Sequence, residues 1–271
     1  MSVAAAVQKT TLTQAEWAQY ERDGFLRLGK LLADDELAAL QNRIDDIMLG
    51  KAQVNYDRML MQLDSDDGNY GHAGPQTKGH KGATLGYRKI QELEFDPLFR
   101  EFMERPIFRH ICETVYGAAT PIAPFRAMFM NKPAQRGTFL PWHQDRWNSL
   151  ELDPLVTIWT ALDPATKANG CVQLIPGSHK AGIVNPSHGS GFLTEEQTRE
   201  HVKPERIVYL ELEPGEVALL HNWTLHGSDV NRTQTSRRAF SACYMDARTR
   251  VRNKADGFSP APEREILFKS L

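Results

Sequence analysis

A change in the spacing of apolar residues near Pro121 constrains the fold of this chain more than any other feature of its sequence. Upstream of Pro121, apolar residues recur with helical spacing, whereas downstream short β-rich runs are separated by proline and glycine. The predicted strands are 125–130, 155–162, 171–175, 207–212, 217–220 and 239–245. Helices followed by strands favour a mainly β fold with flanking α-helices, in which a sandwich or jelly roll carries helices outside one sheet.

The upstream part, residues 1–120, is expected to be mostly helical. The expected elements are a helix between Thr13 and Gly24, a strand over 25–28, a helix capped by Asp34 or Asp35 and ending at Gly50, and helices that begin at Pro97 and Pro106 and end by Gly117. Residues 64–86 have almost no periodic apolar residues, so we expect a long, lid-like loop there, and a second long insertion over 185–203. We expect a single domain, 1–271, with a jelly-roll core over 121–250.

Composition narrows the class of partner. Lysine plus arginine (32) nearly balance aspartate plus glutamate (34), so no charge excess favours nucleic acid or an anionic membrane, and a small molecule is the expected partner. No stretch approaches the roughly 18 apolar residues of a membrane span, and residues 1–10 lack a convincing signal-peptide core. Cys112, Cys171 and Cys243 are odd in number and widely spaced, which favours buried thiols in a reducing compartment. We therefore expect a soluble, cytoplasmic protein.

A candidate metal site lies in the β-rich part. His143 and Asp145 are separated by one residue in a segment expected to be extended, so both point to the same face. His226, just after the predicted strand 217–220, would supply a third ligand, and two histidines with one carboxylate suit iron(II) with open positions. The alternatives are a hydrogen-bonded core histidine at His143, a turn or cap at Asp145, and His221 in place of His226.

Arg237 supports the interpretation of this cluster as a metal site. It lies eleven residues after His226, on or just before the last predicted strand, whose register could aim it into the same barrel. A buried guanidinium needs an anion, and its planar fork matches a carboxylate with two hydrogen bonds.

Several ordered motifs carry a family resemblance. They are PWHQD at 141–145, WTA at 159–161, NGC at 169–171, IPGSHK at 175–180 and HGSDVNRT at 226–233, followed by Arg237. Together they resemble the phytanoyl-CoA dioxygenase (PhyH) family, and the likeness runs from about Lys89 to Tyr244.

The resemblance implies a double-stranded β-helix, a cupin-like jelly roll, with an iron(II) site inside it. It assigns His143, Asp145 and His226 to the metal and Arg237 to the distal carboxylate of 2-oxoglutarate. The further positions that match cosubstrate-contacting residues of the family are Gln144, Trp159, Ser228, Lys89 and Met128. For Lys89 and Met128, a surface lysine and a core methionine remain equal alternatives.

The implied reaction is hydroxylation of an unactivated C–H bond in a small organic metabolite. In it, 2-oxoglutarate and dioxygen become succinate and carbon dioxide, with ascorbate as a supporting reductant. Related halogenases have a small residue in place of Asp145, so the intact aspartate favours hydroxylation, with desaturation or ring chemistry left open. The alternatives are a non-catalytic protein that binds 2-oxoglutarate or metal on the same barrel, and a metal-dependent isomerase or hydrolase, in which Arg237 would have no purpose.

Candidate substrate contacts come from the barrel mouth and the loops. Arg126 and Arg146 could recognise an acidic substrate, with surface ion pairs as an equal alternative for each. The remaining candidates, chosen by their position in or beside the loops, are Tyr70, His72, Trp147 and His188. A free small metabolite, acidic, amino-acid-like or terpenoid, is favoured over a fatty acyl thioester.

Overall fold

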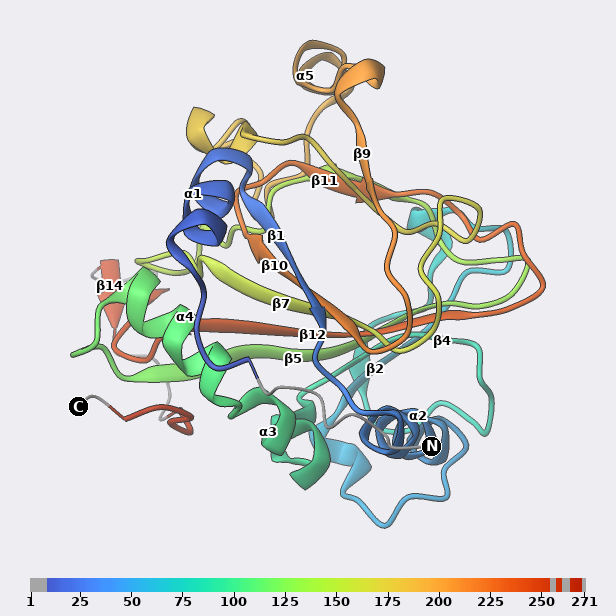
Figure 1. The fold of residues 1–271 in the computed structure, drawn as a ribbon. Coiled ribbons are helices and arrows are strands. Elements are labelled where there is room, and N and C mark those ends of the chain that lie inside the picture. Colours follow the sequence, from blue (N-terminus) through green and yellow to red (C-terminus); the bar gives the residue numbers. More distant parts are fainter. Residues whose placement is uncertain (1–8, 254–256, 260–263, 270–271) are drawn as a thin grey trace, which may run out of the picture.

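The computed structural model describes residues 9–253, 257–259 and 264–269 (Figure 1). The α-helices in this part are α1 (Gln14–Asp23), α2 (Asp34–Met48), α3 (Pro97–Met103), α4 (Pro106–Tyr116) and α5 (Glu195–His201). The strands are β1 (Phe25–Lys30), β2 (Leu60–Leu63), β3 (Thr77–Lys78), β4 (Tyr87–Gln91), β5 (Ile122–Lys132), β6 (Leu140–His143), β7 (Val156–Ala161), β8 (Val172–Leu174), β9 (Val208–Leu210), β10 (Glu216–His221), β11 (His226–Ser228), β12 (Arg237–Asp246), β13 (Val251–Asn253) and β14 (Gly257–Ser259).

Two antiparallel sheets form the body of the described chain. The major sheet has the strand order β1-β10-β7-β12-β5-β4-β2-β3, and the minor sheet has the order β6-β11-β8-β9. The sheets face one another, since one buried cluster joins Trp159 and Ala239 of the major sheet to Leu174 and Leu210 of the minor sheet. The expected mainly β architecture is confirmed.

Helices cover the outer face of the major sheet, as expected (Figure 1). Strand β12 shows why: alternate residues along it, Phe240 and Tyr244 among them, join the buried cluster with α2, α3 and α4. Phe240 packs on Phe99 of α3 with ring centroids 4.8 Å apart, and the Tyr244 hydroxyl donates to the carbonyl of Met103 at 2.9 Å. Burial of each such aromatic side chain contributes about 2 kcal/mol. The intervening residues of β12 face the other way, toward the minor sheet.

The expectation of a mostly helical upstream part is wrong in one respect. Strands β1 to β4 all come from it and extend the major sheet at both edges. Of these, the sequence predicted a strand over 25–28 but none near β2 or β4. Strand β4 has the sequence YRKIQ, and its polar residues are buried or half-buried. The sequence did not predict this strand because a buried strand is expected to be apolar.

The start of α2 also differs from expectation. Its N-cap is Ala33, and neither Asp34 nor Asp35 caps the helix with a side chain. The carboxylate of Glu36 instead accepts a hydrogen bond from the Ala33 amide at 2.8 Å, which satisfies one of the free donors at the helix start.

Two loops approach one another. Residues 64–86 are largely irregular, interrupted by a 3₁₀ turn (Tyr70–His72) and by β3. The insertion between β8 and β9 contains α5 and carries Phe192, whose ring lies 5.5 Å from that of Tyr70. Within the described ranges, no helix combines the length and hydropathy that a bilayer crossing requires.

Candidate active site

Neighbouring strands of the minor sheet bring the predicted metal ligands together. His226, the first residue of β11, lies opposite His143, the last residue of β6. Asp145 follows β6, and its amide donates to the carbonyl of Asn222 at 2.7 Å. Since side chains alternate along an extended chain, His143 and Asp145 point to the same side. Segments far apart in sequence thus supply one cluster.

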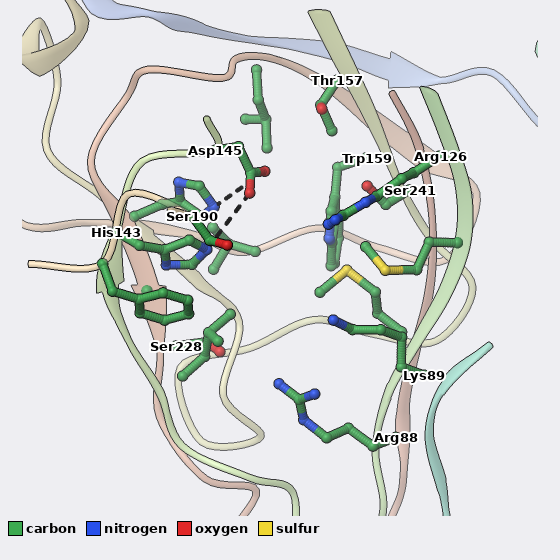
Figure 2. A pocket seen from close by; sticks show the side chains of 18 of the residues that line it. Arg88, Lys89, Arg126, His143, Asp145, Thr157, Trp159, Ser190, Ser228 and Ser241 are labelled. Carbon is green, nitrogen blue, oxygen red and sulfur yellow. Dashed lines mark ion pairs between the residues drawn. The ribbon is translucent and has the colours of Figure 1, made fainter. Parts of the chain in front are cut away.

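Both imidazoles turn their Nε2 atoms toward the carboxylate. His143 Nε2 lies 3.8 Å from Asp145 Oδ1, and His226 Nε2 lies 3.7 Å from Asp145 Oδ2 (Figure 2). These separations are too long for hydrogen bonds. One donor atom from each of the three residues lies within 4.8 Å of the others. The cluster therefore surrounds a space of the size that a metal ion needs.

Backbone carbonyls fix the tautomer of both histidines. His143 Nδ1 lies 2.8 Å from the carbonyl oxygen of Pro141, and His226 Nδ1 lies 2.9 Å from that of Thr224. A carbonyl oxygen can only accept, so each neutral ring carries its proton on Nδ1. The lone pair on each Nε2 is then directed at the space beside Asp145, as in histidines that bind metal.

Burial keeps His143 in the neutral form that a metal needs. Desolvation, followed by repulsion from His226, lowers the pKa of His143 to about 3. At neutral pH the contact between His143 and Asp145 is therefore not an ion pair, although the distance would allow one. Two imidazole nitrogens and one carboxylate are the donor set of iron(II) oxygenases, and the residues present fit that ion.

Arg237, at the start of β12, supplies an unpaired cation to the same cavity. Its side chain is buried, with 2% of the residue exposed, and its Nε and Nη1 atoms find no hydrogen-bond partner among the described residues. Its guanidinium lies 5.4 Å from the ring of Trp159. Desolvation lowers the pKa of Arg237 to about 10, so it remains charged at neutral pH. A buried cation with free donors requires an anion, and a carboxylate matches its fork.

The cluster and Arg237 line one cavity of about 230 Å³ between the two sheets. This volume is below the roughly 300–1,000 Å³ of pockets for drug-sized ligands. Of the cosubstrate contacts expected from the sequence, the cavity is lined by Lys89, Met128, Trp159 and Ser228. Of the expected substrate contacts, it is lined by Tyr70, Arg126 and Trp147.

Gln144 lies outside this cavity, contrary to its expected role beside the cosubstrate. Its side-chain amide donates to the carbonyls of Gly182 and Trp223, each at 2.8 Å, and its Oε1 accepts from the amide of Val184 at 2.7 Å. The alternation that aligns His143 with Asp145 turns Gln144 to the opposite side. Gln144 therefore anchors the segments behind the metal ligands.

Four other histidine or arginine candidates also lie outside the cavity lining. Arg146 donates to the carbonyl of Pro186 at 3.1 Å, and His72 is exposed beside Asp67 at 2.7 Å. His188 accepts from the amides of the loop that carries Phe192. His221, the competing ligand, accepts from the Trp223 amide at 3.1 Å and packs near Tyr20 and His179.

The sequence did not reveal Phe192, which covers one of the metal ligands. Its ring stacks on His143, with centroids 4.7 Å apart and planes at 14°, and its backbone forms a β-bridge with the same residue. The preceding Gly191 has a φ of 69°, and a Cβ there would lie 2.1 Å from the Gln144 carbonyl oxygen. Only glycine allows this approach. The one sequence feature that could have pointed to Phe192 was a glycine directly before an aromatic residue in the insertion.

Arg88 is a second cavity residue that the sequence did not reveal. It donates to Gln62 Oε1 at 2.8 Å and lies 5.0 Å from the Tyr70 ring. Figure 2 shows Arg88 and Lys89 extending from β4 toward the space beside Ser228. Desolvation, followed by repulsion from Arg88 and Arg126, lowers the pKa of Lys89 to about 7. The other unpredicted polar residues of the lining include Gln76, Thr157, Ser190 and Ser241.

Comparison with known proteins places the chain in a family. The family model for phytanoyl-CoA dioxygenase (PhyH) matches residues 20–239. A probable phytanoyl-CoA dioxygenase of Caenorhabditis elegans is 27% identical over 239 residues, which cover 84% of this chain and 73% of that protein.

Solved structures share the fold. EctD from S. alaskensis, with 2-oxoglutarate and 5-hydroxyectoine bound, matches with a TM-score of 0.67 and 20% identity over 93% of this chain and 82% of that one. The alpha ketoglutarate dependent carbocyclase SnoK, from nogalamycin biosynthesis, matches with a TM-score of 0.66 and 18% identity over 93% of this chain and 94% of that one. The expected double-stranded β-helix is thereby confirmed. Since the family model spans most of its length, the chain belongs to the phytanoyl-CoA dioxygenase family.

Proposed function

We propose that this protein is an iron(II)- and 2-oxoglutarate-dependent dioxygenase that hydroxylates a C–H bond of a small organic molecule. One observation carries the proposal: the His143, Asp145 and His226 cluster shares a cavity with the fully buried, unpaired Arg237. A metal-dependent hydrolase or isomerase has use for the first feature but not for the second. The 2-oxoglutarate dianion accounts for both, because it can chelate a metal and offer a distal carboxylate.

The residues of the chain would divide the work as follows. His143, Asp145 and His226 hold iron(II) and leave open positions for cosubstrate and dioxygen. Arg237 fixes the distal carboxylate of 2-oxoglutarate and so sets its orientation. When bound there, the metal and cosubstrate supply oxidation by dioxygen, which yields succinate and carbon dioxide and places one oxygen atom in a substrate C–H bond. Phe192, stacked on His143, covers one side of that ligand.

The first measurement of the test needs no knowledge of the substrate. Many such enzymes consume 2-oxoglutarate slowly without substrate, so the protein is incubated with iron(II), ascorbate, 2-oxoglutarate and dioxygen, and succinate is measured. The expected result is succinate that increases further with a small organic substrate. Tight binding of both iron(II) and 2-oxoglutarate without succinate from any candidate would favour the non-catalytic alternative. Absence of 2-oxoglutarate binding would refute the proposal.

A reducing compartment, the cytoplasm, remains our proposal for where the protein works. Cys112, Cys171 and Cys243 are all buried and unpaired. Burial raises the pKa of the Cys171 thiol to about 11 and that of Cys243 to about 12, so both stay protonated and unreactive. Imaging of a tagged full chain tests this proposal, and confinement of the signal to an organelle would contradict it.

A further inference from the structure

The cavity carries more positive charge than the proposed chemistry uses. Its lining contains three arginines, Arg88, Arg126 and Arg237, against the single carboxylate of Asp145, and Lys89 is in addition partly protonated at neutral pH. Iron(II) and the 2-oxoglutarate dianion have equal and opposite charges, so binding both leaves this excess unchanged. Unbalanced charge in a low-dielectric cavity is costly. A second anion would balance it.

Arg126 is the arginine of this lining that has neither a polar partner nor an assigned ligand. Arg237 is assigned to 2-oxoglutarate, and Arg88 donates to Gln62. Arg126, by contrast, makes no hydrogen bond or ion pair with any residue that the structure describes. Its contacts are aromatic: the guanidinium carbon lies 4.6 Å from the Trp147 ring centroid and 5.2 Å from that of Phe125.

Contacts with the two aromatic rings hold this guanidinium in position. Phe125 and Trp147 are themselves packed edge to face, with centroids 4.4 Å apart. Stacking on ring faces leaves the in-plane N–H donors of an arginine free. Figure 2 shows the Arg126 side chain reaching into the cavity on the side opposite His143. The donors are therefore held ready for a ligand.

Strand register separates Arg126 from the cosubstrate anchor. On β5 and β12, Arg126 pairs with Cys243 while Arg237 pairs with Lys132, so the two arginines start from different ends of the strand pair. Six residues of strand correspond to about 20 Å. The two guanidinium groups therefore enter the cavity from well-separated backbone positions, so 2-oxoglutarate and a second anion can each have an arginine.

We propose that Arg126, braced by Phe125 and Trp147, is the anion site for the substrate, and that the substrate is a small organic acid bound by its carboxylate. This inference rests on the proposed function, because it assumes that Arg237 and the metal are occupied by 2-oxoglutarate. The carboxylate takes the free N–H donors of Arg126, and the hydrocarbon part of the acid lies toward the metal cluster. Met128 and Leu220, which also line the cavity, supply apolar contacts for it.

The experiment compares acids with their uncharged isosteres. The protein is loaded under nitrogen with iron(II) and saturating 2-oxoglutarate, whose own binding is measured first. Straight-chain monocarboxylates from propanoate to octanoate, each matched with its primary amide, are then titrated calorimetrically. A charge-assisted hydrogen bond predicts that at least one acid binds wild-type protein about tenfold or more tightly than its amide.

Matched variants assign that preference to Arg126. Arg126→Gln should remove it while 2-oxoglutarate binding stays close to wild type. The melting temperature should fall only slightly, since the side chain loses its two ring contacts but no hydrogen bonds. Arg126→Lys keeps the charge without the fork and should retain part of the preference. Arg199→Gln, on exposed α5 with 74% of its side chain exposed, is the control and should match wild type.

The outcomes separate the two proposals. Absence of 2-oxoglutarate binding to wild type refutes the proposed function. Normal 2-oxoglutarate binding with no acid preferred over its amide refutes the substrate site alone. A preference that survives in Arg126→Gln also overturns it, because the anion is then bound elsewhere. The comparison of acid with amide on wild type needs no variant, so it decides the question even if a variant folds poorly.

Discussion

Replacement of Arg237 by methionine should stabilise the ligand-free protein while it destroys cosubstrate binding. Burial lowers the pKa of Arg237 from 12.5 to about 10. A base whose folded pKa lies below its unfolded value opposes folding at every pH below the folded pKa, and the penalty is relieved only between pH 10 and 12.5. At neutral pH the penalty is about 3 kcal/mol, to order of magnitude.

Methionine fills a similar volume without charge. Removal of the guanidinium abolishes the penalty but also loses its contact with Trp159, which contributes about 1 kcal/mol. We therefore expect Arg237→Met to raise the free energy of unfolding, measured by urea denaturation without ligand, by about 1–3 kcal/mol. The dissociation constant for 2-oxoglutarate should rise at least about 30-fold, because a buried charge pair loses one partner.

Arg238 offers a matched control one residue away. It faces the outer side of the sheet, where its Nε and Nη2 atoms donate to Asp163 at 2.8 Å each and Nη1 donates to Asp45 at 2.6 Å. These carboxylates raise the pKa of Arg238, the opposite direction to Arg237. After a discount for partial exposure, Arg238→Met should lower the free energy of unfolding by about 2 kcal/mol and leave 2-oxoglutarate binding unchanged.

Together, Arg237→Met and Arg238→Met test whether Arg237 is an uncompensated buried cation. The expected changes in stability have opposite signs at adjacent arginines of one strand. Loss of more than about 1 kcal/mol in ligand-free Arg237→Met would show that its guanidinium is not an uncompensated charge. Wild-type affinity for 2-oxoglutarate in that variant would remove Arg237 from the cosubstrate site.

Three further predictions concern residues around the cluster. Asp145→Ala should abolish succinate formation and lower bound iron at least about 100-fold, measured by metal analysis after dialysis; full activity would exclude Asp145 as a ligand. Gln144→Leu leaves three backbone groups without partners and should lower the free energy of unfolding in urea by about 3 kcal/mol. The KM for 2-oxoglutarate should stay unchanged. A raised KM with normal stability would contradict the structural role. The pKa of Lys89 is about 7 in the folded protein, against an ordinary value of 10.5, so above pH 7 the unfolded chain binds more protons than the folded one. The free energy of unfolding of the ligand-free protein should therefore rise by about 2 kcal/mol between pH 7 and 9. Lys89→Met should abolish that rise.

Local alternation predicted the metal site better than it predicted its surroundings. A period of two residues is enough to place His143 and Asp145 on one face, and the structure brings both to His226. The same period requires Gln144 to point away, which it does. Its expected cosubstrate role came from the family resemblance and ignored this constraint. At position 144 the alternation of side chains, and not the family pattern, determines the orientation.

The rest of the site depends on features that a strand pattern does not contain. Strand β4 was missed because Arg88 and Lys89 make it read as a surface segment, although both are directed into a cavity. A polar interior strand can be recognised only once the cavity that it lines is known. Phe192 comes from an irregular insertion, where no periodicity predicts which ring folds back onto His143. Tertiary contacts alone determine these positions.

The division of the site between the two sheets links cosubstrate binding to stability. His143 and His226 belong to the minor sheet, whereas Arg237 belongs to the major sheet. A cosubstrate held by the metal at one end and by Arg237 at the other therefore joins the sheets, and it also neutralises a cation whose burial opposes folding. Saturating ligand at about 100 times its dissociation constant should add about 2.7 kcal/mol to wild-type stability. Because the link needs both ends, Asp145→Ala and Arg237→Met should each reduce this gain to about 0.9 kcal/mol or less at the same 2-oxoglutarate concentration, although they alter opposite walls of the cavity.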